Sequence, residues 1–220
     1  MTELDKEQIL EIRVPGLRRA AMPAIPLGIR DALIGDPVGD AIIWITVAED
    51  VDRLYPWYTV IPLFHPDHDG MAIEVGTNLP ASAFGLGRLQ KWFRRDPDAR
   101  DRLASVLALE IPIVQESFGA AAGWAKHVMP DERDYDDFPD LLETMAYADL
   151  LSGAVTESLS LLSRLELLDD TVGRRSAAMR AMIEHDPGEA LGTLAGWRER
   201  RLAMFGLDTA PSASARTRND

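Results

Sequence analysis

The sequence contains no cysteine, which excludes disulfide bonds, thiolate nucleophiles and metal sites built from thiolates. Long apolar runs are missing as well, since none approaches the roughly eighteen residues that a membrane-spanning helix needs. The first residues, MTELDKEQ, are acidic, whereas a secretory signal peptide begins with a basic segment followed by an apolar one. From these absences we expect a folded protein of the bacterial cytoplasm without a membrane partner.

Positive charge is scarce. The chain has 23 Lys and Arg against 36 Asp and Glu, a formal net charge of −13. Proteins that bind nucleic acids rely on neutralising phosphates, and an anionic membrane surface makes the same demand. The charge balance therefore argues against both of these partners, and it leaves another protein or a copy of the same chain as the expected partner.

The charges are also unevenly distributed. The segment 131–143, DERDYDDFPDLLE, combines seven acids with one arginine, while residues 171–218 carry eight arginines against five acids. A chain with this layout can fold its basic helices onto its own acidic segment, or it can dock on a copy of itself. The acids that we expect to contact a partner are Asp131, Glu132, Asp134, Asp136, Asp137 and Asp140.

The hydrophobic pattern predicts an α+β fold, with an antiparallel sheet of three or four strands in the N-terminal third. Strands are expected over 9–14, 41–47, 57–64 and 71–76, although a helix from Asp5 is an alternative to the first. Short helical pieces are expected near 27–34, 50–55 and 86–95. The sheet region would occupy residues 1–85 and a helical region residues 86–206, either as two domains or as one, and 207–220 would be a disordered tail.

The helical region is organised around residues 138–168, where apolar side chains recur every three or four positions as on one face of a helix. We expect one long central helix here, with a bend or a close helix crossing at Ser152-Gly153-Ala154. A helix from Pro97 to about residue 128 would be kinked at Pro112, because proline lacks the backbone donor and crowds the preceding turn. Further helices are expected over 171–184 and 187–205.

A metal site is one interpretation of the loop at His65, Asp67, His68 and Asp69. Imidazole nitrogens and carboxylate oxygens are ligands for zinc, manganese or iron. The same residues, together with Pro66 and Gly70, are also typical of a tight turn. The sequence identifies no cofactor beyond this.

Glu110 is the candidate catalytic residue. It lies on the apolar face of the helix from Pro97, two positions before Pro112. Burial beside a kink would raise the pKa of its carboxyl group and suit it to acid–base chemistry, whereas a structural role would have Glu110 bond a backbone group. Together with Glu74, it is also a candidate for the missing metal ligand.

Three functions therefore stay open. The first is a non-catalytic factor (an adaptor, chaperone-like or inhibitory, immunity-like protein) that binds another protein. The second is a small-molecule enzyme, metal-dependent or not, with a pocket between the 57–76 hairpin and the kinked 97–128 helix. The third is a homo-oligomeric structural protein joined through the acidic segment and Arg174, Arg175, Arg198 and Arg201.

Overall fold

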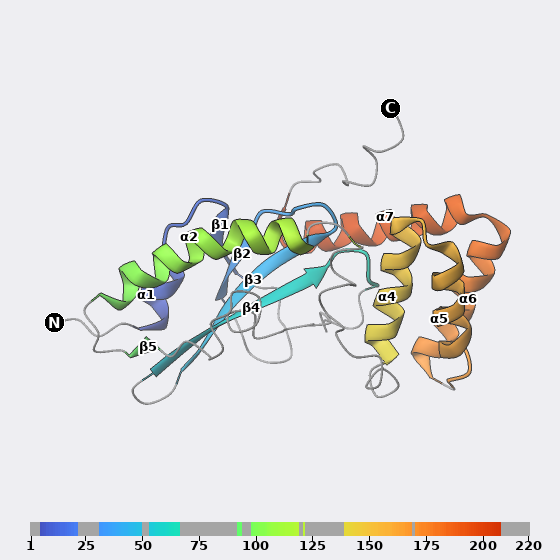
Figure 1. Cartoon of the computed structure of the whole chain (residues 1–220), viewed down its shortest axis with the longest axis horizontal. Coiled ribbons are helices and arrows are strands. Elements are labelled where there is room, and N and C mark those ends of the chain that lie inside the picture. Colours follow the sequence, from blue (N-terminus) through green and yellow to red (C-terminus); the bar gives the residue numbers. More distant parts are fainter. Residues whose placement is uncertain are drawn as a thin grey trace, which may run out of the picture. The chain divides into compact units, whose positions relative to one another are not determined.

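The computed structural model describes residues 5–21, 31–49, 53–66, 92–93, 98–118, 121, 139–168 and 170–207. They fall into two compact units. The first draws on 1–37, 42–61 and 70–116, and the second on 38–41, 62–69 and 117–220. The predicted α+β class is confirmed, with an antiparallel sheet in the N-terminal part and helices in the C-terminal part (Figure 1).

The sheet has the strand order β1-β2-β3-β4-β5. Its strands are β1 (Leu17–Ala21), β2 (Asp31–Gly35), β3 (Ala41–Glu49), β4 (Arg53–Pro62) and the two-residue β5 (Trp92–Phe93). The strand predicted over 41–47 is confirmed as β3. The side chains on both faces of β3 are buried from Ala41 to Ile45, as expected for a strand with a continuous apolar sequence. The strand predicted over 57–64 is confirmed for the part that lies within β4.

Several local predictions in this region are wrong. Residues 31–34 are strand rather than helix, Arg53 begins β4 rather than a helical turn, and Trp92–Phe93 pair with β4. Strand pairing overrides local pattern here, as in the pairing of Leu33 with Ile45 of β3. The strand predicted over 71–76 lies outside the described residues.

The strand predicted over 9–14 is also wrong, and the alternative of a helix from Asp5 is correct. The helix α1 (Lys6–Leu10) begins with a capping box. The Asp5 carboxylate accepts from the Gln8 backbone N–H at 2.8 Å, and the Gln8 side chain accepts from the Asp5 backbone N–H at 3.2 Å. These two bonds satisfy donors that a helix start otherwise leaves free.

The predicted helix around Pro112 is confirmed as α2 (Ala99–Phe118), which contains that proline in its interior. One face of α2 is buried through Leu103, Leu107 and Ile111. Pro112 itself is exposed on the other side. The kink at Pro112 stays a prediction.

In the second unit, the single long helix expected over 138–168 is wrong. The segment forms two helices, α4 (Pro139–Ser152) and α5 (Val155–Leu165), which pack side by side (Figure 1). Gly153 ends α4 with a φ of 86°. The backbone N–H of Ala154 donates to the carbonyl of Asp149, and that of Gly153 to the carbonyl of Leu150. This is a Schellman cap, which needs a left-handed residue and favours glycine.

The two C-terminal helices are confirmed as α6 (Thr171–His185) and α7 (Pro187–Met204). Asp186 separates them, because its carboxylate caps α7 by accepting the Gly188 N–H at 2.8 Å, while Pro187 occupies the first helical position. No helix in the described parts of the chain is both long and apolar enough to cross a membrane.

Two arginines of α7 fasten this helix to the segments 38–41 and 62–66 of the same unit. The Arg198 guanidinium donates to the Gly39 carbonyl at 3.0 Å and lies 3.5 Å from the Asp40 carboxylate. Arg201, which is 1% exposed, donates to the Pro62 carbonyl at 3.0 Å. Because His65 follows Pro62 closely, these bonds help to hold His65 in place.

Candidate functional site

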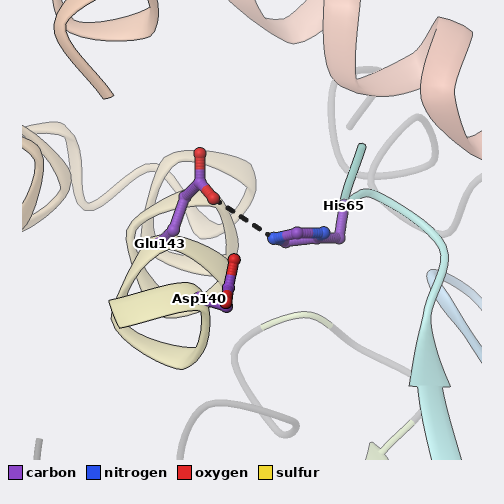
Figure 2. A group of neighbouring side chains, drawn as sticks. All are labelled: His65, Asp140 and Glu143. Carbon is purple, nitrogen blue, oxygen red and sulfur yellow. Dashed lines mark ion pairs between the residues drawn. The ribbon is translucent and has the colours of Figure 1, made fainter. Parts of the chain in front are cut away.

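The described residues bring a buried polar cluster together from three separate parts of the sequence. His65 follows β4, Glu143 and Tyr147 lie one turn apart on α4, and Arg175 lies on α6. Figure 2 shows the His65 ring pointing toward α4, with Glu143 and Asp140 facing it. We refer to His65, Asp140, Glu143, Tyr147 and Arg175 as the Glu143 cluster.

Glu143 is the centre of this cluster, and its side chain is fully buried. One carboxylate oxygen, Oε1, accepts from the Tyr147 hydroxyl at 2.5 Å and from Arg175 Nε at 2.9 Å. The other, Oε2, accepts from Arg175 Nη2. The guanidinium therefore binds Glu143 in a two-pronged arrangement, which gives Arg–carboxylate pairs both strength and orientation.

Arg175 also reaches Asp140, one turn before Glu143, with a nitrogen–oxygen distance of 3.3 Å. The Asp140 side chain is half-exposed, whereas that of Arg175 is mostly covered. A helix from the basic part of the chain thus neutralises acids of the segment 131–143 within the same unit. This is one of the two outcomes that the charge layout predicted.

The contacts decide the ionisation of Glu143. Burial by itself would raise the pKa of this carboxyl group, but hydrogen bonds from Arg175 and Tyr147 and the neighbouring His65 ring outweigh burial and lower the pKa to about 2. Burial and the neighbouring Glu143 charge raise the pKa of the Tyr147 phenol well above its usual value. At neutral pH, Glu143 is therefore an anion and Tyr147 a hydrogen-bond donor.

His65 is held differently at its two ring nitrogens. Nδ1 lies 3.0 Å from the Pro66 carbonyl, and because a carbonyl oxygen can only accept, Nδ1 carries the proton. Burial lowers the pKa of His65; Glu143 counteracts this, while the charges of Arg201 and Arg175 add to it. Nε2 lies 3.4 Å from Oε2 of Glu143 and has no hydrogen-bond partner in the described structure.

The donor atoms of His65, Asp140 and Glu143 lie within 4.8 Å of one another, so these three residues could hold a divalent metal ion. One imidazole and two carboxylates suit zinc, manganese or iron better than magnesium or calcium. The Arg175 guanidinium competes with such an ion, because it already neutralises both carboxylates. A metal would have to displace Arg175 from Asp140 and from one oxygen of Glu143.

The structure tests only some of the predicted site residues. His65 is buried in the cluster, and Asp140 pairs with Arg175. Outside the described residues lie Asp67, His68, Asp69, Glu74, Asp131, Glu132, Asp134, Asp136 and Asp137, together with the side chain of Glu110. All four arginines proposed for a homo-oligomer contact, Arg174, Arg175, Arg198 and Arg201, donate hydrogen bonds within their own chain.

Sequence reasoning missed Glu143 and Tyr147 as parts of a site, and it named Arg175 only for a contact between copies of the chain. One signal was present: Glu143 and Tyr147 stand four positions apart on the helix that begins at Pro139, so they share a face. Tyr147 also packs on Trp197 of α7, with ring centroids 5.4 Å apart.

Comparison with known proteins finds no match to a family model, to a curated protein or to a solved structure.

Proposed function

We propose that this chain is a non-catalytic factor that binds another protein through an exposed apolar surface of α2. The observation that supports this is the exposure of two large apolar side chains one turn apart: Leu109 is 72% exposed and Ile113 is 48% exposed. Pro112 is exposed beside them. We refer to Leu109, Pro112 and Ile113 as the α2 apolar surface.

These residues stand three and four positions apart and are neighbours on the helix surface. Single exposed apolar side chains are ordinary, whereas a contiguous group of them is typical of a surface that a partner covers. Burying a leucine or isoleucine side chain contributes roughly 1.5–3 kcal/mol, so two of them supply a substantial part of a micromolar affinity. Ser105 and Glu116 lie next to this surface on α2 and would form its polar rim.

The Glu143 cluster supports a non-catalytic role. Its carboxylate is fully buried and already saturated by Arg175 and Tyr147, so it has no room to exchange protons with a substrate. The net charge of −13 would steer a basic partner toward the chain. Neutralising Asp134, Asp136 and Asp137 should then slow association and weaken its dependence on salt. A cytoplasmic location belongs to the same proposal.

The test uses the doubly substituted chain Leu109→Asp/Ile113→Asp. A matched control is Leu167→Asp, because Leu167 is 82% exposed but lies after α5 in the other unit. Partners co-purified with the wild-type chain are identified by mass spectrometry and quantified for each variant. We expect a specific polypeptide to be retained by wild type and by Leu167→Asp and to be lost from the double variant. Equal retention by all three proteins would refute the proposed surface.

The same experiment addresses self-association. If the α2 apolar surface binds a second copy of the chain, the native mass of the wild type is that of an oligomer and the double variant is a monomer. If instead the arginines join copies through the acidic segment, high salt dissociates the oligomer and the α2 substitutions leave it intact.

A second candidate is a metal-dependent enzyme centred on His65, Asp140 and Glu143, favoured by the unpartnered Nε2 of His65. Zinc and manganese content is measured after incubation and desalting. His65→Asn keeps a side-chain N–H for the Pro66 carbonyl but removes the ligand atom, so it should lower bound metal. Arg175→Gln removes the competing cation and should raise it. Equal metal content in wild type and both variants would eliminate this candidate.

A further inference from the structure

A cleft in the first unit combines positive charge with a volume suited to a small molecule. It has a volume of about 780 Å³ and is lined by residues between 10 and 19 and by Arg100. Pockets that hold small ligands typically measure about 300–1,000 Å³. The cleft therefore has room for a molecule the size of a nucleotide.

Four arginines line this cleft, namely Arg13, Arg18, Arg19 and Arg100, and Glu11 is the one acid among the described residues of its lining. The described lining residues thus carry three net positive charges, or two once Glu7, which pairs with Arg19, is counted, in a chain whose total is −13. Asp98 and Asp101 flank Arg100 along the chain, but neither lines the cleft. Such a local reversal of sign concentrates positive potential in one place.

The arginines differ in how they are engaged. Arg19 forms an ion pair with Glu7 at 2.9 Å, and Arg18 also has a partner. In the described part of the chain, Arg13 and Arg100 form neither an ion pair nor a hydrogen bond through their side chains. Both are exposed. Two guanidinium groups are therefore available to a ligand without first giving up an internal partner.

Buried apolar side chains alternate with the charged residues along the segment that lines the cleft. Leu10, Ile12 and Val14 line the cleft and are at most 5% exposed. Their side chains anchor the segment that carries Arg13. Arg100 lies in the first turn of α2, whose N-terminal end carries partial positive charge and adds to the attraction for an anion.

We propose that this cleft binds a small phosphorylated molecule, of the class of a nucleoside triphosphate. Guanidinium groups bind phosphate oxygens with two parallel hydrogen bonds, and arginines are favoured where phosphates are recognised. An extended polyanion such as DNA or RNA fits less well, because the rest of this acidic chain repels it. This binding is a function in addition to the capture of a partner protein, and it involves other residues.

Isothermal titration calorimetry with ATP and with pyrophosphate tests the proposal on the full chain. Both should bind at low ionic strength, and the affinity should fall as salt is added. Arg13→Ala/Arg100→Ala should weaken binding by about tenfold or more, because a hydrogen bond to a charged group contributes at least that much. A matched control is Arg174→Ala, since Arg174 is an exposed arginine of α6 in the other unit.

Binding of ATP together with pyrophosphate, lost in the double variant and kept in the control, supports recognition of the phosphate groups. Binding of ATP alone with the same dependence on the arginines supports recognition of the whole nucleotide. The proposal is overturned if neither compound binds at about 1 mM, where a useful cellular site would be occupied. It is also overturned if Arg174→Ala weakens binding as much as the double variant does.

Discussion

Replacing Arg175 with methionine should destabilise the protein strongly, because it strands the Glu143 carboxylate in the interior. The pKa of Glu143 is about 2 in the folded chain against an ordinary 4.5. A pKa shift of one unit corresponds to about 1.4 kcal/mol. The lowered pKa of Glu143 therefore contributes about 3 kcal/mol to the stability of the folded chain at neutral pH. Removing one partner of a buried pair typically costs about 3–5 kcal/mol. We expect Arg175→Met to lose free energy of unfolding in this range.

The measurement is urea unfolding near neutral pH, completed as a double-mutant cycle with Glu143→Gln. Gln keeps the shape of the side chain without its charge, so Glu143→Gln/Arg175→Met should be more stable than Arg175→Met alone, with a coupling energy of about 2 kcal/mol or more. The matched control is Arg180→Met on the same helix. Arg180 pairs with Glu166 and Glu184 in a partly exposed site, so its loss should cost at most about 1 kcal/mol.

The effect of Arg175→Met should also depend on pH. In the wild type, the depressed pKa of Glu143 contributes stability that is present above pH 4.5 and is lost as the pH falls toward 2. Without Arg175, burial dominates and raises the pKa of Glu143. Protonation at acidic pH then removes the unpaired buried charge, which reduces the destabilisation of the variant. The difference in stability between the two proteins should therefore shrink on acidification. A cost equal to that of Arg180→Met, or a difference independent of pH, would refute this account of the Glu143 cluster.

Three further outcomes are expected. Gly173→Ala should destabilise the chain by more than about 2 kcal/mol in urea unfolding. The reason is that a Cβ atom there would lie 1.9 Å from the Leu168 carbonyl oxygen, well inside contact distance. A change below about 0.5 kcal/mol would contradict this packing. Asp186→Ala removes the cap of α7 and should lower the free energy of unfolding by about 1 kcal/mol, and with it the melting temperature. An unchanged melting temperature would contradict this role of Asp186. Because the pKa of His65 is lowered in the folded chain, the unfolded chain takes up a proton more readily, and wild-type stability should begin to fall as the pH drops below 6.5. His65→Asn should remove this part of the decline. An identical pH profile for that variant would show that His65 is not the group responsible.

The fold class could be predicted from the sequence because strands and helices differ in hydrophobic period. The same periodicity wrongly predicted a single helix over 138–168. The segment forms two helices that meet at Gly153, and the apolar spacing runs almost unbroken from one into the other. The signal for the break was Gly153 itself, whose positive φ permits the Schellman cap. At the N-terminus, Asp5 and Gln8 carried the spacing of a capping box, which distinguishes helix from strand better than the alternation of residues 9–14 does.

The candidate site could be predicted only in part, because its partners come from distant positions. His65 was identified as a possible metal ligand, but the ligand atoms closest to it in the described structure belong to Glu143 and Asp140 on α4. No local pattern connects these residues, since the segment 62–66 and α4 are far apart in the sequence and meet only through the packing of the second unit. Asp140 was expected to face a partner, yet Arg175 of the same chain neutralises it. Charge counts predicted an attraction between the two segments without deciding between one molecule and two.

We propose above that the α2 apolar surface captures a partner protein. The most direct measurement is the affinity of the partner identified by co-purification for wild type, Leu109→Asp/Ile113→Asp and Leu167→Asp, each checked for folding by circular dichroism. We expect the double variant to bind at least about a hundredfold more weakly, since two buried apolar side chains contribute about 3 kcal/mol or more. The Leu167→Asp control should bind like wild type. Wild-type affinity in the folded double variant would contradict the proposed function.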